Sequence, residues 1–281
     1  MIVFLNGKFL PEAEAFVPLN DRGFLLGDGL FETIRVAGGK PIRFAQHLER
    51  LARGADFLKI APPFTPRELQ KFAVDLIGKN ELPESILRVT LPRGPGARGY
   101  STKGADTPTL AMTLNPLPPV NPDEPLLWSL VTSSFRIPAG DQLASFKTTS
   151  KLVNVLARAE AEARGADEAL LLNTNGEVAE TSGGNIFWLY RDRICTVPTG
   201  RGVLPGITRA VVLEICQSLG LETNKCVVKP DQLRRAEGIF VTQSALGIVP
   251  VVAFDGAPVA PSPLVDQIAG AYNDMLMREQ L

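Results

Sequence analysis

Two lysines lie four residues apart in the segment ASFKTTSK, residues 144–151, directly before a stretch with helical periodicity. A neutral lysine amine can attack a carbonyl carbon or move a proton, so either lysine could do chemistry. The apolar residues at helical spacing, which predict the buried face of a helix starting near Ser150, are Leu152, Leu156, Ala159 and Ala163. Lys151 lies on another face of this helix together with charged residues, so its side chain is expected to face solvent. Lys147 precedes the helix, so its side chain is not assigned to the surface.

A carboxylate and two turns could complete a site around a lysine. Glu180 lies between an apolar strand and the turn SGGN, residues 182–185, where its side chain could enter a cleft. In LPGITR, residues 204–209, a glycine and a hydroxyl residue lead into a helix whose first N–H groups could bind an oxyanion. In FVTQS, residues 240–244, an apolar strand ends in three hydrogen-bonding side chains. An ordinary helix cap and an ordinary polar strand end remain the alternative interpretations of these two turns.

Three arginines are candidates for binding anions. Arg50 lies in a helical segment and could bind a phosphate or simply face water. Arg93 precedes the glycine-rich segment GPGARGY, residues 94–100, and Arg98 lies within it; the segment is either a flexible hairpin tip or a mobile lid that binds carboxylates bidentately. His47 is the one histidine of the chain, so sites with several histidine ligands are excluded, and a plain helical residue is expected there. The proton-transfer group of an enzyme would then be a lysine, carboxylate or tyrosine.

The bulk composition narrows the class of protein. The chain has 281 residues, of which 45% are hydrophobic and 21% charged, as in a globular protein with a sizeable core. The net charge of −1 gives no reason to expect a nucleic acid or a membrane surface as partner. No apolar run reaches the length of a membrane span and no leader segment is recognisable, so a cytoplasmic protein is expected. The three cysteines form no C-x-x-C pair, which supports neither a disulfide framework nor a metal site.

A proline-rich segment divides the chain. Residues 115–125, NPLPPVNPDEP, predict a stiff linker between a domain over residues 1–114 and another over residues 126–281. The elements expected in the first domain are hairpins at Asn6-Gly7 and Gly38-Gly39, helices over 44–58 and 65–78, and strands over 86–92 and 108–114. This pattern predicts a small α/β domain.

The second domain is expected to be larger and rich in β-structure. The expected elements are a strand over 127–134, the helix after Lys147, hairpins at Asn175-Gly176 and within residues 185–198, a helix capped by Thr208 and ending at Gly220, strands over 238–254, and a last amphipathic helix. Regular β-α-β alternation and a G-x-G-x-x-G after the first strand are both missing from the sequence, so the fold class is α+β and not a Rossmann fold.

Together these segments resemble the class IV aminotransferases, the pyridoxal-phosphate enzymes of fold type IV. The resemblance rests on GDG followed by FETIRV, on HLERL, Lys147, GADEALLLNTNGEVAETSGGNIF, LPGITR and TQSALGIVPV, and it covers nearly the whole chain. It implies pyridoxal 5'-phosphate as cofactor, a small-molecule amino substrate, a two-domain fold and a homodimer.

The resemblance also implies a role for each candidate. Lys147 matches the Schiff-base lysine, and Glu180 matches the carboxylate that pairs with the pyridine nitrogen. The residues that match the phosphate site are Arg50, Ile207, Thr208, Gln243 and Ser244. The residues expected to bind the substrate are Arg93, Arg98 and Tyr100. Thr33, in FETIRV, matches the active-site threonine and is the candidate for assisting a leaving group.

Two reactions fit this resemblance. The segment PRGPGARGYS resembles the loop of 4-amino-4-deoxychorismate lyase, an enzyme of folate biosynthesis that forms p-aminobenzoate and pyruvate. A transaminase for D-amino acids, branched-chain amino acids or small amines is the alternative, because Ser150 replaces an asparagine common in lyases. Leu152 stands where the branched-chain members have a tyrosine, which argues against a branched-chain transaminase without excluding it. The intact Lys147 and Glu180 argue against a binding protein without catalytic activity.

Overall fold

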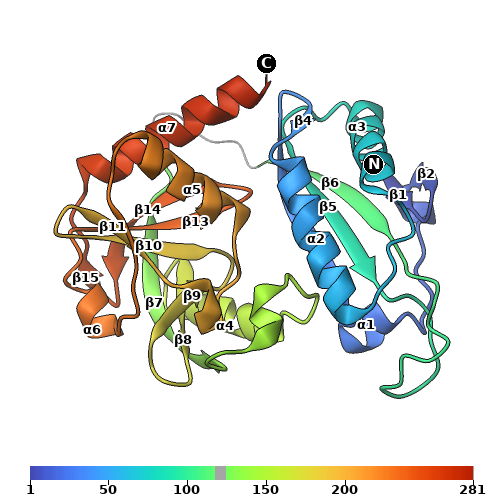
Figure 1. Ribbon diagram of the computed structural model, residues 1–281, viewed down its shortest axis with the longest axis horizontal. Helices are drawn as coiled ribbons and strands as arrows, with labels where there is room; N and C mark the ends of the chain where they lie inside the picture. Colours follow the sequence, from blue (N-terminus) through green and yellow to red (C-terminus); the bar gives the residue numbers. More distant parts are fainter. Residues whose placement is uncertain (118–124, 281) are drawn as a thin grey trace. The chain divides into compact units, whose positions relative to one another are not determined.

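The computed structural model describes residues 1–117 and 125–280, which form two compact units (Figure 1). Unit 1 comprises Met1–Pro118, Phe146–Ser150 and Leu276–Leu281, and unit 2 comprises Pro119–Ser145 and Lys151–Met275. Residues 118–124 of the expected linker lie outside the described residues. None of the helices in the described part of the chain is long and apolar enough to cross a bilayer.

Unit 1 is built on an antiparallel sheet whose described strands have the order β2-β1-β6-β5-β3-β4. Its elements are β1 (Ile2–Leu5), β2 (Lys8–Pro11), η1 (Glu12–Glu14), α1 (Arg22–Leu26), β3 (Gly29–Ala37), β4 (Lys40–Pro41), α2 (Phe44–Leu58), α3 (Pro66–Asn80), β5 (Ser85–Pro92) and β6 (Ala111–Pro116). Both expected hairpins are present. Asn6 and Gly7 have φ of 49° and 91°, the left-handed conformation that a two-residue hairpin turn of this type requires.

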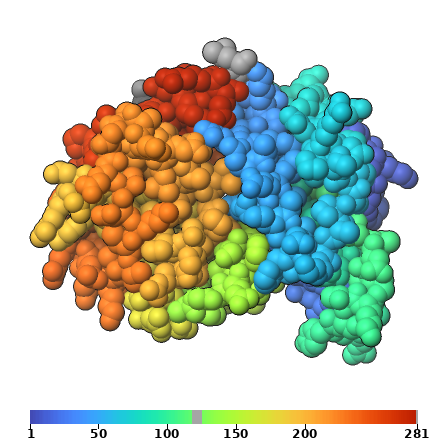
Figure 2. All heavy atoms as spheres, in the orientation of Figure 1, coloured from blue at the N-terminus to red at the C-terminus, as the bar shows by residue number. Residues whose placement is uncertain are grey.

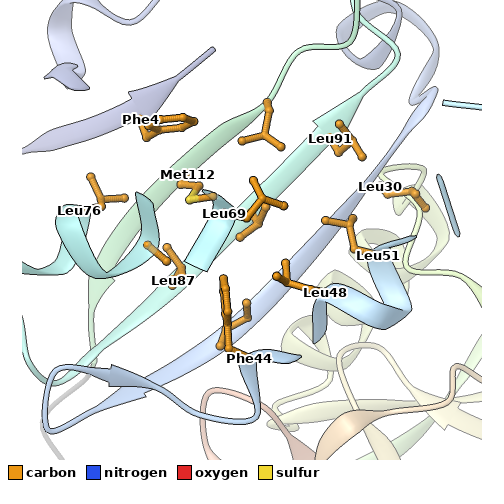
Figure 3. Packing of buried hydrophobic residues seen from close by; sticks show 14 of the residues in the cluster. Phe4, Leu30, Phe44, Leu48, Leu51, Leu69, Leu76, Leu87, Leu91 and Met112 are labelled. Atoms are coloured by element: carbon orange, nitrogen blue, oxygen red, sulfur yellow. The ribbon is translucent and has the colours of Figure 1, made fainter. Parts of the chain in front are cut away.

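The core of unit 1 lies between one face of this sheet and the helices α2 and α3. Leucines of α2 and α3 meet Leu30 of β3, Leu87 of β5 and Phe4 of β1 in a continuous apolar cluster (Figure 3). The side chains of α2 and α3 form a continuous surface over this part of unit 1 (Figure 2). Because alternate residues of a strand point to opposite faces, Phe31 and Thr33 of β3 lie on the face away from this core.

Unit 2 holds a mixed sheet whose described strands have the order β12-β11-β10-β13-β14-β7-β8-β9, with β15 paired to β14. Its elements are β7 (Trp128–Ile137), η2 (Gln142–Ser145), α4 (Leu152–Ala163), β8 (Glu168–Asn173), β9 (Val178–Thr181), β10 (Asn185–Tyr190), β11 (Arg193–Thr196), η3 (Thr199–Arg201), α5 (Ile207–Ser218), β12 (Thr223–Lys225), α6 (Pro230–Leu233), β13 (Gly238–Gln243), β14 (Gly247–Phe254), β15 (Ala257–Pro258) and α7 (Pro263–Gln280), whose last residues group with unit 1. Three pairs are parallel, namely β11/β12, β14/β7 and β7/β8. The expected α+β fold class is confirmed.

The prediction for the buried face of α4 is wrong. Ala157 and Ala161 are fully buried, and they pack with strands β7 and β8, whereas the side chain of Leu152 is 70% exposed and that of Leu156 40% exposed. The helix has two apolar stripes, and the stripe of small residues is the one that permits close packing on the sheet. The helix begins close to the expected position, with Lys151 as its N-cap residue and no side-chain cap.

The start of α5 also differs from the expectation. Its N-cap is Gly206, so Thr208 is the second residue of the helix and does not cap it. A β-carbon at position 206 would lie 2.0 Å from Oδ1 of Asn185, so the close approach of the two segments requires glycine. The first turn of α5 consequently has no side-chain cap, which leaves its N–H groups directed out of the helix.

Candidate active site

The segment that carries Lys147 is fixed by backbone hydrogen bonds to β3 within unit 1. The N–H of Phe31 donates to the carbonyl of Lys147 over 2.9 Å, and the N–H of Thr149 donates to the carbonyl of Gly29 over 2.9 Å. Nζ of Lys147 lies 4.6 Å from the centre of the Phe31 ring. Lys147 is therefore held on the face of β3 that is turned away from the apolar core.

Arg88 of β5, which the sequence-based prediction missed, lies on the same ring. Its guanidinium carbon is 4.0 Å from the centre of the Phe31 ring, and burial lowers the pKa of Arg88 below its ordinary value. Thr33 is its direct cross-strand partner, so the two side chains share a face. Lys147 and Arg88 thus both lie over the ring of Phe31, and Thr33 lies on the same face of the sheet. An arginine inside the alternating strand SILRVTLP is the sequence signal that could have revealed this position.

Behind this face, three ionisable side chains form a buried cluster. Glu32 of β3 accepts hydrogen bonds from Nδ1 of His47 over 2.7 Å, and from Nε and a terminal nitrogen of Arg50 over 2.8 and 2.6 Å. All three side chains are at most 3% exposed. The structure thus engages Arg50 in an ion pair inside unit 1, and the phosphate role expected for it stays a prediction.

The pKa values of this cluster follow from burial and charge. Burial alone would raise the pKa of Glu32, but the hydrogen bonds and charges of Arg50 and His47 outweigh it, so its pKa is lowered. Burial lowers the pKa of His47, and the nearby positive charges of Arg50 and Lys147 add to this effect against the pull of Glu32. At neutral pH, Glu32 is therefore ionised and His47 is neutral, with its Nδ1–H donating to the carboxylate.

Arg93 is engaged within unit 1 in a way that does not support the substrate role expected for it. Its guanidinium donates twice to the carboxylate of Asp28, and once each to the carbonyls of Leu58 and Lys59. Burial tends to raise the pKa of Asp28, but the hydrogen bonds of Arg93 and Arg22 prevail and lower it. These contacts tie β5 to the end of α2, which is a structural role.

The backbone of the expected lid accepts hydrogen bonds from the side chain of Arg22 in α1. Its guanidinium donates to the carbonyls of Gly99, Tyr100 and Ser101 over 3.0 to 3.3 Å. The side chains of Arg98 and Tyr100 are exposed, and the segment between β5 and β6 projects from the sheet of unit 1 (Figures 1 and 2). The backbone of this loop is therefore anchored while its two candidate substrate residues point outward.

In unit 2, Glu180 of β9 faces the segment that leads into α5. Its Oε2 accepts a hydrogen bond from the N–H of Leu204 over 3.0 Å, and the amide of Asn185 donates to the carbonyl of the same residue over 2.9 Å. These two contacts hold the turn before α5 next to the carboxylate. The carboxylate and the helix N-terminus thus belong to one structural unit.

The end of β13 adds hydroxyl groups to this arrangement. Thr242 is the cross-strand partner of Asn185, so its side chain projects from the same face of the sheet. Its Oγ1 is buried and has no hydrogen-bond partner among the described residues. Ser244, two residues later, is half-buried in the following turn. An uncapped helix N-terminus together with a buried, unpaired hydroxyl is suited to an anion with several acceptor oxygens.

Gln243 belongs to a different cluster, built around Glu168 of β8. The carboxylate of Glu168 accepts a short hydrogen bond from Ser182 and a longer one of 3.4 Å from Nε2 of Gln243. Burial raises the pKa of Glu168 despite these contacts. A β-carbon on Gly183 would lie 2.9 Å from the same Nε2. Gln243 therefore lies against the glycine turn after β9. The phosphate role expected for it stays a prediction.

Comparison with known proteins identifies the family. The family model "Amino-transferase class IV" matches residues 29–254. The chain belongs to the class IV aminotransferase family. It is therefore an enzyme, and the cofactor that this family uses, pyridoxal 5'-phosphate, is its cofactor.

The relatives differ in the activity that their names give. The chain is 33% identical to the "Putative branched-chain-amino-acid aminotransferase" of Methanocaldococcus jannaschii, over 91% of this chain and 88% of the relative. It is 28% identical to the D-alanine aminotransferase of Bacillus licheniformis, over 99% and 98%. It is 29% identical to the aminodeoxychorismate lyase of Bacillus subtilis, over 89% and 85%. The three relatives thus share similarity to this chain, but the substrates that their names give differ.

The fold agrees with this family. The structure matches that of the branched-chain aminotransferase from Thermoproteus uzoniensis with a TM-score of 0.92 and 29% identity, over 99% of this chain and 95% of that one. The residues of unit 2 fit the cofactor: the first N–H groups of α5 and the unpaired hydroxyl of Thr242 could hold its phosphate, and Glu180 could hold its ring nitrogen. Lys147 carries the amine that the resemblance matches to the Schiff-base lysine, and this role stays a prediction.

Proposed function

We propose that this enzyme is a 4-amino-4-deoxychorismate lyase, which releases pyruvate and forms p-aminobenzoate. The observation that carries the proposal is the placement of Lys147 and Arg88 over the ring of Phe31 in unit 1, with Thr33, the cross-strand partner of Arg88, on the same face of the sheet. An elimination needs a base, a group that assists departure of the leaving group, and a cation for a carboxylate. These three side chains provide one of each.

The roles follow from the chemistry of each side chain. The bound cofactor supplies a ring that takes up the electron pair left when a bond at the substrate carbon breaks. The amine of Lys147 removes the proton next to the substrate nitrogen. The hydroxyl of Thr33 donates a hydrogen bond and then a proton to the departing enolpyruvate. Arg88 and the exposed Arg98 bind the two carboxylates of the substrate, which Arg93 is too fully engaged to do.

A class IV aminotransferase is the second candidate, favoured by the names of the relatives from Methanocaldococcus jannaschii and Bacillus licheniformis. In that reaction Lys147 removes the same proton and delivers it to a different carbon, so a keto acid is released and Thr33 has no leaving group to assist. Arg88 would then bind the carboxylate of the amino acid.

The test compares the two reactions on the same enzyme. Pyruvate and p-aminobenzoate should form from aminodeoxychorismate without any added keto acid, and Thr33→Ala should slow this release by about 100-fold, whereas Thr33→Ser should retain most of it. Keto-acid formation from D-alanine or L-leucine with 2-oxoglutarate is measured in parallel. Rapid transamination without pyruvate release from aminodeoxychorismate, unaffected by Thr33→Ala, would replace the lyase with the aminotransferase.

We also propose that the enzyme is a homodimer in the cytoplasm. The resemblance implies a dimer, and two exposed apolar surfaces support it. Phe24 and Leu25 of α1 are 71% and 57% exposed, and Leu152 and Val155 of α4 are 70% and 61% exposed. Neighbouring exposed apolar side chains that form a contiguous patch mark a candidate interaction surface. A second copy of the chain is the occupant that would cover both.

The dimer is tested by light scattering of wild type and of Val155→Lys. A mass near twice 30.3 kDa is expected for the wild type, with weakened association for the variant. The exposed Val252 of β14 gives a matched control, and Val252→Lys should leave the mass unchanged. A wild-type monomer that turns over substrate would overturn the proposal.

A further inference from the structure

Two of the three cysteines lie side by side in unit 2, although 30 residues separate them in the sequence. Sγ of Cys195 is 3.7 Å from Sγ of Cys226. The contact is built by the sheet: β11 runs parallel to β12, with Cys195 opposite Asn224, and the N–H of Cys226 donates to the carbonyl of Thr196 over 2.8 Å. The two thiols are therefore held together by backbone pairing at the edge of a sheet.

The two thiols differ in accessibility. Cys195 is 3% exposed within the core of unit 2, whereas Cys226 is partly exposed at its margin. Burial, followed by the neighbouring Cys226, raises the pKa of Cys195 to about 12. A reagent in solution thus meets Cys226 first, with Cys195 directly behind it. This order is the one that a pair of attacking and resolving thiols requires.

We propose that Cys195 and Cys226 are a thiol–disulfide exchange site that takes a low-molecular-weight disulfide as its oxidant. The thiolate of Cys226 attacks one sulfur of the small disulfide, whose other half leaves as a thiolate and takes up a proton. Cys195 then attacks the sulfur of Cys226, and the proton that it gives up neutralises the departing thiolate, so the second small thiol is released. Two protein thiols are oxidised, and one small disulfide is reduced to two thiols.

The bridge needs only a local movement. The sulfur atoms must approach from 3.7 Å to the roughly 2.05 Å of a disulfide bond. Because Cys195 pairs with Asn224, two residues before Cys226, closing the bridge takes a movement of the backbone after the edge strand β12 as well as side-chain rotation. The closed loop would contain η3, α5 and β12, and with them Ile207 and Thr208. Cross-linking a loop of this size restricts the unfolded chain. We expect the bridge to stabilise the unit that contains the N-terminus of α5, whichever reaction the enzyme catalyses.

The full-length enzyme is incubated with oxidised glutathione and analysed by intact mass, by thiol titration after unfolding and by peptide mapping. The expected result is a mass lower by about 2 Da, a single remaining thiol at Cys216 and a Cys195–Cys226 peptide pair. The melting temperature should rise by on the order of 5 °C and return after reduction with dithiothreitol.

Matched variants identify each step. Cys195→Ser should stop at a stable glutathione adduct on Cys226, whereas Cys216→Ser should form the bridge like the wild type. A wild-type protein that keeps three thiols, or accumulates the glutathione adduct without closing the bridge, would overturn the exchange site. A bridged protein whose melting temperature does not rise would overturn the stabilising role.

Discussion

Two sets of buried polar groups, one in each unit, differ in how far side chains of the same unit satisfy them. In unit 1, Asp28 and Glu32 each have two cationic or hydrogen-bonding partners from the same unit. In unit 2, the N-terminus of α5 has no side-chain cap and the hydroxyl of Thr242 is buried without a partner among the described residues. The first set of groups is satisfied internally, and the second set is not.

The paired groups of unit 1 have the character of structural charges, whereas the unsatisfied groups of unit 2 have the character of a ligand site. A buried polar group without a partner costs stability, so a protein keeps one mainly where a ligand or an ordered water completes it. The internally paired clusters of unit 1 instead fix β3, α2 and the loop after β5, which carry the face around Phe31. The five predictions that follow test this division, from the largest expected effect to the smallest.

Lys147→Ala should have the largest effect, because it removes the proposed base from the face around Phe31. Turnover should fall by about 10²- to 10⁴-fold. Borohydride reduction followed by denaturation should leave no cofactor on the chain, because the amine that binds it is missing. Lys151→Ala, at the N-cap of α4, is the control and should retain both properties. Covalent trapping of the cofactor in Lys147→Ala would show that another amine carries it.

Glu32→Gln tests whether the cluster in unit 1 is a structural one. The variant leaves the buried charge of Arg50 without its carboxylate, which should lower the free energy of unfolding by about 3–5 kcal/mol. Glu84 is the control, because it pairs with Arg35 while its side chain is 50% exposed. Glu84→Gln should cost less than about 1 kcal/mol. Equal urea midpoints for the two variants would contradict the division between buried and exposed pairs.

Glu180→Gln tests the carboxylate of unit 2. A neutral amide can still accept the hydrogen bond from Leu204, so the turn before α5 should keep its structure. It cannot hold the pyridine nitrogen protonated, so the turnover number should fall by about 100-fold while cofactor remains bound. Absorbance of the purified variant measures the bound cofactor. An unchanged turnover number would remove Glu180 from the site.

His47 should make the stability of unit 1 depend on pH. Because its pKa is lowered in the folded state, the unfolded chain takes up the proton first as the pH falls below the ordinary value of 6.5. Stability should therefore decline between pH 6.5 and the lower pKa of the folded state, and Glu32 should add to the loss only below its ordinary value of 4.5.

Glu168 affects the pH dependence of stability in the opposite direction. Because its pKa is raised in the folded state, its protonation at low pH favours the folded chain. The informative quantity is therefore the difference between wild type and His47→Gln in urea titrations at pH 7 and pH 5. The wild type should lose more stability than the variant over this interval. An equal loss in both proteins would show that folding does not shift the pKa of His47, and a smaller loss in the wild type would show that His47 is protonated in the folded state at neutral pH.

Much of the fold was predictable, because local signals decide it. The hairpin turns follow from Asn6-Gly7 and Gly38-Gly39, and α2 has the predicted bounds of residues 44–58. The buried face of α4 was not predictable from periodicity, because the helix has two apolar stripes and only packing chooses between them. The cap of α5 was missed for a similar reason: Gly206 is required by its distance to Asn185, a contact that the sequence does not show.

The site residues divide in the same way. The resemblance supplied Lys147 and Glu180 as candidates, but sequence alone could not distinguish Arg93, which is held by Asp28, from Arg88, which lies over Phe31. The pairing of Cys195 with Cys226 depends on two strands meeting in parallel, and no spacing in the sequence signals it. Contacts between segments distant in the chain are what the sequence leaves undetermined.

The smallest effect concerns two buried threonines of unit 2 that differ in their partners. Oγ1 of Thr196 donates to the carbonyl of Ile186 over 2.9 Å, whereas Oγ1 of Thr242 has no partner in the described part of the chain. Without cofactor, Thr196→Val should cost about 1 kcal/mol of unfolding free energy, and Thr242→Val should cost nothing or add slight stability. Pyridoxal phosphate should raise the melting temperature of Thr242→Val less than that of the wild type, because the hydroxyl that would meet the phosphate is gone. If both valine variants lose the same stability without cofactor and respond equally to it, Thr242 is an ordinary core residue, and the contrast between the two units rests on the helix N-terminus alone.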